Sequence, residues 1–173
     1  METITPLTFE PLKTEEFRAF WAAAHRETFR LTFGSEIADS DLAKELDRTR
    51  GYSEKSPDSS VIGTVGGTPA AIAQLEKRAG GGGSFGWVHF YYVSPQFRGN
   101  GYGRKLVDYS VEYFRNFELT RFYLRVAEIN AGAIQFYLKC GFTRSPNGDK
   151  SGRAGRELMM AYDCCGSDSA ATP

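Results

Sequence analysis

The sequence has little of several features that would place it in a special class of protein. It contains only three cysteines, Cys140, Cys164 and Cys165, whose spacing matches neither a zinc site nor a disulfide framework. No apolar stretch approaches the length that spans a bilayer. Its 21 Lys and Arg residues balance its 21 Asp and Glu residues, so no net charge attracts nucleic acid or an anionic membrane. We therefore expect a protein of the reducing cytoplasm, without nucleic-acid or membrane partners.

The rest of the composition is that of a globular protein. The chain has 173 residues, of which 41% are hydrophobic and 24% charged. A chain of this length can bury most of its apolar surface in one core. We expect a single domain over residues 1–163, and a small, polar, disordered tail over residues 164–173.

The spacing of apolar residues predicts strands and helices in alternation. Strands are expected at 7–9, 61–65, 70–77, 87–93, 122–126, 142 and 158–162, and helices after a Thr14 cap, at 41–50, at 103–115 and from an Asn130 cap to 138. Gly66-Gly67 predicts a hairpin turn, 52–60 a loop, and the four glycines at 80–83 a flexible turn. The second half therefore indicates an α/β or α+β sheet domain.

The most informative segment is 93–104, with the sequence VSPQFRGNGYGR. A strand ends there, a glycine-rich turn follows, and a helix begins. Backbone N–H groups at a helix start are free and carry partial positive charge, and glycines let a pyrophosphate approach them. Arg98, Arg104 and Lys105 add positive charge.

Other interpretations of this turn are weaker or remain open. A dinucleotide-binding Rossmann turn needs a further glycine where Leu106 stands, and the Gly-Lys-Ser/Thr of a Walker A motif is absent. On local grounds alone, a plain glycine turn before a helix explains the segment as well as a phosphate site does.

Two linked motifs resemble the GCN5-related N-acetyltransferase (GNAT) superfamily. Arg-x-x-Gly-x-Gly after a strand that ends in Val-x-Pro resembles its phosphate-binding motif. The segment 124–142 resembles its second signature in order and spacing through Leu124-Arg125-Val126, Asn130, Ala133-Ile134, Phe136-Tyr137 and Gly141-Phe142. The resemblance implies a mixed, mostly antiparallel sheet of six to seven strands with splayed fourth and fifth strands and about four helices.

The resemblance also implies acetyl-CoA as cosubstrate, held by a core over residues 87–142, and no metal. By position, the cofactor-binding residues are Tyr91, Tyr92, Val93, Arg98, Gly99, Asn100, Gly101, Tyr102, Gly103, Arg104, Asn130 and Tyr137. The end of the fourth strand is expected to pair with the pantetheine arm as an added strand would.

Three residues are candidates for proton transfer. Tyr137 matches the family's tyrosine, and a phenol is protonated at neutral pH and ready to donate, although a core tyrosine beside Ile134 is the alternative. His89 is expected on the same strand face as Tyr91 and is a candidate base; a half-exposed strand histidine is the alternative. Glu76 is the rival base.

Other residues bear on the acceptor. Members that acetylate ribosomal proteins carry Glu where this sequence has Arg125, which argues against such a substrate. The aromatic residues Phe17, Phe20, Trp21 and Phe29 are expected mainly in the core, His25 at the surface, and Cys140 as a space filler.

The resemblance implies transfer of an acetyl group from acetyl-CoA to a primary amine by direct attack in a ternary complex. We expect a small-molecule acceptor, and a peptide amine is the other acceptor class. A homodimer is an open alternative to a monomer. The alternatives are a catalytically silent acyl-CoA-binding sensor or interaction module, and a nucleotide-binding domain of another family.

Overall fold

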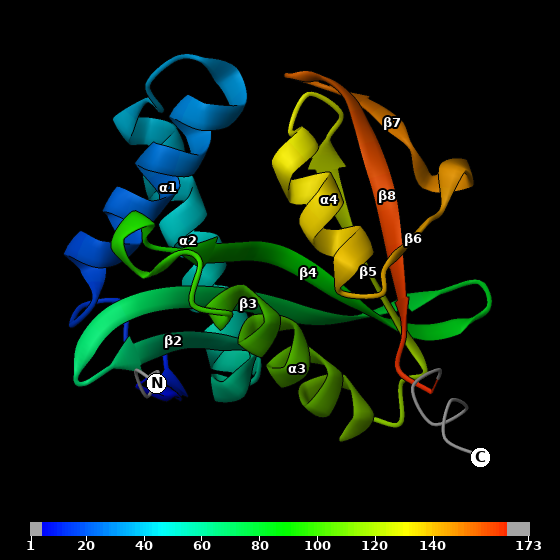
Figure 1. Cartoon of the computed structure of the whole chain (residues 1–173), viewed down its shortest axis with the longest axis horizontal. Coiled ribbons are helices and arrows are strands. Elements are labelled where there is room, and N and C mark those ends of the chain that lie inside the picture. Colours follow the sequence, from blue (N-terminus) through cyan, green and yellow to red (C-terminus); the bar gives the residue numbers. More distant parts are fainter. Residues whose placement is uncertain (1–4, 166–173) are drawn as a thin grey trace. The chain divides into compact units, whose positions relative to one another are not determined.

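A computed structural model describes residues 5–165 of the protein (Figure 1). The tail expected over 164–173 therefore lies outside the described residues except for Cys164 and Cys165. Within the described part, no helix is both long enough and apolar enough to cross a membrane.

The chain divides into two compact units. Unit 1 comprises Met1–Leu75 and His89–Tyr109, and unit 2 comprises Glu76–Val88 and Ser110–Pro173. The prediction of a single domain over residues 1–163 stays a prediction, and each unit is considered by itself below.

Unit 1 contains two complete helices, two complete strands and parts of three further elements. They are β1 (Leu7–Pro11), α1 (Arg18–Phe33), α2 (Asp39–Lys55), a 3-10 turn η1 (Pro57–Ser59), β2 (Ser60–Val65), most of β3 (Thr68–Gly80), the end of β4 (Gly83–Val93), a second 3-10 turn η2 (Pro95–Phe97) and the start of α3 (Tyr102–Arg115). The strand order is β1-β2-β3-β4, and β1 and β3 are both antiparallel to β2. The predicted hairpin turn between β2 and β3 is confirmed, since Gly66 and Gly67 have φ values of 56° and 80°.

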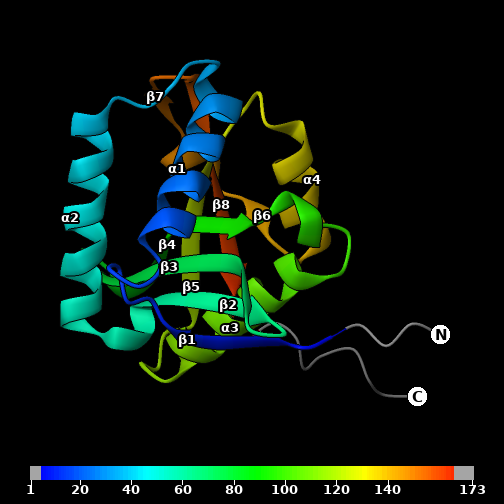
Figure 2. The ribbon, with the colours of Figure 1, turned by 90° about the vertical axis from the view of Figure 1, so that its left-hand side faces the viewer.

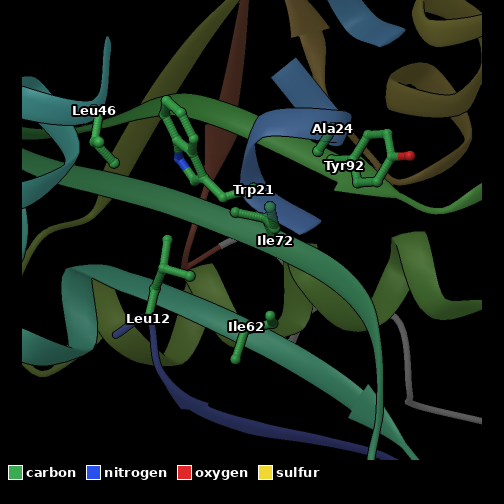
Figure 3. Packing of buried hydrophobic residues seen from close by; sticks show 7 residues of the cluster. All are labelled: Leu12, Trp21, Ala24, Leu46, Ile62, Ile72 and Tyr92. Atoms are coloured by element: carbon green, nitrogen blue, oxygen red, sulfur yellow. The ribbon is translucent and has the colours of Figure 1, made fainter. Parts of the chain in front are cut away.

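Each face of the unit 1 sheet carries helices. One face packs on α1 and α2 through a cluster that includes Trp21, Leu46 and Ile72 (Figure 3). The two helices lie side by side in both ribbon views (Figures 1 and 2). Leu106 of α3 belongs to a second cluster with Val61 of β2. Trp21 is 1% exposed, which confirms its assignment to the core.

The structure corrects the expected bounds of the first two helices. Helix α1 begins at Arg18, and its cap residue is Phe17 rather than Thr14. Helix α2 does not end at Gly51 but continues to Lys55, through part of the expected loop. Pro57 sets the end, because a residue that precedes proline is forced out of the helical conformation.

His25 is not the surface residue that the sequence predicts. Its ring lies between Trp21 and Phe90, with ring centres 4.2 Å from each. Burial lowers the pKa of His25 to about 4. The imidazole is therefore neutral at pH 7 and belongs to the aromatic core of unit 1.

In unit 2 the strand order is β3-β4-β5-β8-β6, and β7 also pairs with β8. Its own elements are β5 (Arg121–Ala127), α4 (Ala131–Lys139), β6 (Thr143–Arg144), a 3-10 turn η3 (Pro146–Gly148), β7 (Lys150–Gly152) and β8 (Gly155–Asp163). Strand β7 was not predicted, and the strand expected at Phe142 is β6, which begins at Thr143.

The pairing of β4 with β5 is parallel and short. It consists of Gly86–Phe122 and Trp87–Tyr123. Gly86 has no room for a side chain, because a Cβ there would lie 2.6 Å from Cβ of Phe122. The mixed sheet with this parallel pair confirms the predicted fold class. Residues 5–165 contain four α-helices, as expected, and eight strands rather than six to seven.

Candidate functional site

The glycine-rich loop joins β4 to α3 within unit 1. Gly99 and Gly101 have φ values of 83° and 78°, a conformation that other residues rarely adopt. A Cβ added to either glycine would meet no atom within 4 Å, so the surface of the loop is open there. A ligand can therefore approach the backbone of this loop closely, because no side chain stands in its way.

Five consecutive backbone N–H groups in this loop are available. The backbone N–H groups of residues 99–103 donate no hydrogen bond within the described part of the chain. The first N–H groups of α3 that do so are those of Arg104 and Lys105, which both donate to the carbonyl of Gly101. Left-handed residues that alternate with others make successive N–H groups converge on one anion. The start of α3 adds the partial positive charge of a helix N-terminus. The loop can therefore hold a phosphate with main-chain donors.

The arginines of the loop are engaged with carboxylates. The Arg98 Nη2 donates to Oε1 of Glu27 at 2.7 Å, and its Nε donates to the carbonyl of Val93 at 2.9 Å. The Arg104 Nε donates to Oδ1 of Asp108 at 2.9 Å. Their positive charges are partly compensated, so the main-chain amides are the principal anion-binding groups of the loop.

Glu27 is a site residue that sequence reasoning missed. Its Oε2 accepts a hydrogen bond from the hydroxyl of Tyr92 at 2.6 Å while its Oε1 accepts from Arg98. It thus links α1 to both the end of β4 and the loop. Glu27 is the single acidic residue of α1, but its partners lie about 70 residues away in the chain, so no local sequence pattern marks it as a site residue.

The end of β4 has different surroundings on its two faces. Tyr91 and Val93 pack on the cluster that contains Leu106, whereas Tyr92 belongs to the cluster with Trp21. Burial, followed by the hydrogen bond to Glu27, raises the pKa of Tyr92 to about 12. The Tyr92 hydroxyl is therefore a fixed, neutral donor at pH 7.

The sequence predicted that His89 and Tyr91 lie on the same face of β4, but the structure places them on different faces. His89 stacks on Tyr52 of α2 with ring centres 4.3 Å apart, and its Nδ1 is 3.3 Å from the tyrosine hydroxyl. The next residue, Phe90, stacks on His25 of α1. Two successive side chains therefore face the same helical layer, which interrupts the alternation of the strand in the way a β-bulge does.

The other candidates for proton transfer lie in unit 2. Glu76 of β3 accepts a hydrogen bond at 2.7 Å from Nε of Arg78. Tyr137 of α4 is half-buried, and its ring lies 5.2 Å from that of Phe142. Burial, followed by the nearby Cys140, raises the pKa of Tyr137, so this phenol is protonated throughout the neutral range.

Asn130 caps helix α4, as predicted. Its Oδ1 accepts a hydrogen bond of 3.1 Å from the backbone N–H of Ala133. Gly141 follows the helix with a φ of 97°, which confirms the left-handed turn. The assignment of Asn130 to the cofactor arm stays a prediction, because the observed contact is local.

The structure thus brings together some of the predicted cofactor-binding and proton-transfer residues. Residues 98–104 and 91–93, with His89, lie in unit 1, whereas Glu76, Asn130 and Tyr137 lie on separate elements of unit 2. Within residues 5–165, no three His, Cys, Asp or Glu side chains are placed to hold a metal ion.

Comparison with known proteins identifies the class. The model of the acetyltransferase (GNAT) family matches residues 14–142, which include the glycine-rich loop and helix α4. The chain therefore belongs to the acetyltransferase (GNAT) family, a family of acyltransferases, and the resemblance predicted from the sequence is confirmed.

Individual relatives agree with this assignment. An uncharacterized N-acetyltransferase of Methanocaldococcus jannaschii is 35% identical over 71 residues, which are 41% of this chain and 29% of the relative. The matched segment thus spans less than a third of that curated relative.

Solved structures share the fold. YncA of Salmonella typhimurium, crystallised with its cofactor acetyl-CoA, is similar with a TM-score of 0.69 and 18% identity, and the similarity covers 98% of each chain. The ribosomal-protein-alanine N-acetyltransferase of Brucella melitensis has a TM-score of 0.66 and 18% identity over 91% of this chain and 99% of its own.

Proposed function

We propose that this protein is an N-acetyltransferase that moves an acetyl group from acetyl-CoA to a primary amine by direct attack in a ternary complex. The observation that carries the proposal is the row of five open backbone N–H groups at residues 99–103, directly after β4 and before α3. The family to which the chain belongs supports it.

The loop fits the diphosphate of coenzyme A. A diphosphate needs several converging donors and a backbone without side chains in the way, and Gly99 and Gly101 leave that space open. The clamp formed by Glu27 and Arg98 fixes the start of the loop against the carbonyl of Val93. Tyr91, Tyr92 and Val93 are then the β4 residues whose main chain pairs with the pantetheine arm.

The chemical step needs three contributions from this chain. The acceptor amine, with a pKa of about 10 in water, must lose a proton before it attacks the thioester carbonyl. His89 and Glu76 are the two candidates for receiving that proton. As the carbon–sulfur bond breaks, Tyr137 gives its phenolic proton to the leaving thiolate, and backbone N–H groups near Val93 stabilise the negative charge that develops on the carbonyl oxygen.

A small-molecule amine is the proposed acceptor, and a peptide amine is the other class to be tested. The Brucella melitensis neighbour acts, by its name, on ribosomal-protein alanine, so the fold accommodates peptide acceptors in that protein. Arg125 here replaces the glutamate found in such enzymes, which favours an acceptor of another kind.

Two measurements test the proposal. Acetyl-CoA should raise the melting temperature of the protein while NAD and ATP should not, because only a ligand that prefers the folded state stabilises it. A thiol-release assay with a panel of small-molecule and peptide amines should then detect turnover that Tyr137→Phe lowers. Stabilisation by acetyl-CoA without turnover on any amine would instead indicate a silent acyl-CoA-binding module.

A further inference from the structure

Unit 2 carries two guanidinium groups on one tryptophan ring. The guanidinium carbons of Arg78 on β3 and Arg125 on β5 lie 4.5 Å and 5.1 Å from the centre of the Trp87 ring. Trp87 on β4 is 7% exposed, so its ring is a fixed platform. Cations bind to the faces of indole rings because of the ring quadrupole. The platform therefore concentrates positive charge from two strands at one place.

The two arginines differ in how their charge is compensated. Arg78 forms an ion pair with Glu76, with Nε and Oε2 2.7 Å apart. Arg125 donates from Nε and Nη2 to one carbonyl oxygen, that of Gly148 in η3, at 3.2 Å each. Among residues 5–165, no carboxylate is paired with Arg125. The cluster thus holds two guanidinium groups against one carboxylate.

The position of Arg125 follows from the alternation of β5. Phe122, Leu124 and Val126 are buried on one face of the strand, whereas Tyr123 and Arg125 are partly exposed on the other. The last pair between β5 and β4 is Trp87–Tyr123, and Arg125 comes two residues later. Its guanidinium therefore lies on the side of the sheet that carries the Trp87 platform, where the described pairing of the two strands ends.

Burying half of a guanidinium without a paired carboxylate costs free energy, because a neutral carbonyl only partly replaces the lost hydration of the charge. Gly148 and Trp87 hold Arg125 from two sides and leave donors free. A planar guanidinium fork matches the geometry of a carboxylate or a phosphate. These properties are those of a prepared site for an oxyanion.

We propose that Arg125, stacked on Trp87 and hydrogen-bonded to Gly148, binds an oxyanion carried by the amine acceptor. The acceptor is then an amine with a carboxylate or a phosphate group, such as an amino acid or a phosphorylated amine. This inference rests on the proposed acetyltransferase function.

Matched acceptor pairs test the inference. Thiol release from acetyl-CoA is measured with amino acids against their amides, and with phosphoethanolamine against ethanolamine. The wild type should show a higher kcat/KM for the anionic member of at least one pair, and the pair that responds identifies the oxyanion. Arg125→Gln should lower the ratio of anionic to neutral kcat/KM about 10- to 100-fold, the effect of losing a charge-assisted hydrogen bond.

Arg121→Gln is the matched control. Arg121 is an exposed arginine on the same strand that pairs with Asp163, so its loss should leave the acceptor ratio unchanged. Arg125→Lys keeps the charge but not the fork and should give an intermediate ratio. If thermal melting shows that Arg125→Gln is unfolded, the acceptor ratio of Arg125→Lys tests the inference in its place.

Three results would overturn the inference. The wild type could prefer neither member of any pair, Arg125→Gln and Arg125→Lys could leave the ratio as it was, or acetyl-CoA could stabilise the protein while no acceptor of either kind is acetylated. Absence of stabilisation by acetyl-CoA would instead overturn the proposed function itself.

Discussion

The glycine-rich loop of unit 1 and the Trp87 platform of unit 2 are both proposed to bind anions, but they are built differently. The loop uses main-chain N–H groups of consecutive residues, 99–103. The platform uses side chains from β3, β4 and β5 and a carbonyl from η3. A site made of consecutive backbone can be recognised in a sequence, whereas a site made of distant side chains exists only once the chain has folded.

The largest expected effect comes from the backbone of the loop. Gly101→Val forces a β-branched residue into a φ of 78° and places a side chain over the proposed diphosphate site. Strain of about 1–3 kcal/mol should weaken binding of coenzyme A about 10- to 100-fold, as titration calorimetry would measure. Gly34→Val, at a φ of 66° in the C-cap of α1, is the matched control for strain alone. Equal binding by both variants would remove the distinction between the two kinds of site.

The aromatic core provides a contrast in which stability changes and binding does not. The pKa of His25 is lowered to about 4 in the folded protein, so below pH 6.5 the unfolded chain binds more protons than the folded one. Stability should therefore fall as the pH drops from 7 to 5, by about 1–2 kcal/mol.

Urea unfolding at these two pH values measures the effect of His25. His25→Phe, which keeps a stacked ring but cannot titrate, should lose most of this pH dependence. A wild type whose stability is the same at pH 7 and pH 5 would show that His25 is solvated and titrates normally.

A substitution of Glu27 tests whether the loop binds coenzyme A independently of its contact with α1. Glu27→Ala removes the partner of both Arg98 and Tyr92 and should weaken coenzyme A binding about tenfold. Binding of S-acetyl-pantetheine, which lacks the diphosphate, should change much less. Glu36→Ala, whose exposed carboxylate pairs with Arg30, is the control. An equal loss for both ligands would mean that Glu27 supports the fold of α1 and β4 rather than the loop.

The smallest effect is expected at Asn130. Asn130→Ala removes the cap of α4 and should lower the stability by about 1 kcal/mol. Denaturant unfolding measures this loss, and calorimetry with coenzyme A asks whether the residue also holds the cofactor arm. A binding defect larger than the stability loss would show that a short motif in unit 2 binds directly, as the loop of unit 1 does.

Local sequence chemistry determined several parts of this protein. The glycines at 66, 67, 99, 101 and 141 specified turns of positive φ, the Asn130 cap and the start of α3 followed from neighbouring residues, and the two linked motifs identified the family. These features depend on interactions between residues a few positions apart, so a single sequence is enough to predict them.

Only the tertiary structure decided the rest. It placed Glu27 on Arg98 and Tyr92, stacked His25 and His89 on aromatic rings of other elements, and set Arg125 beside Trp87. It also interrupted the alternation of β4, so that the successive residues His89 and Phe90 stack on rings of α2 and α1, respectively. The physical reason is that packing between segments far apart in the chain fixes which side chains meet, and no local pattern records those partners.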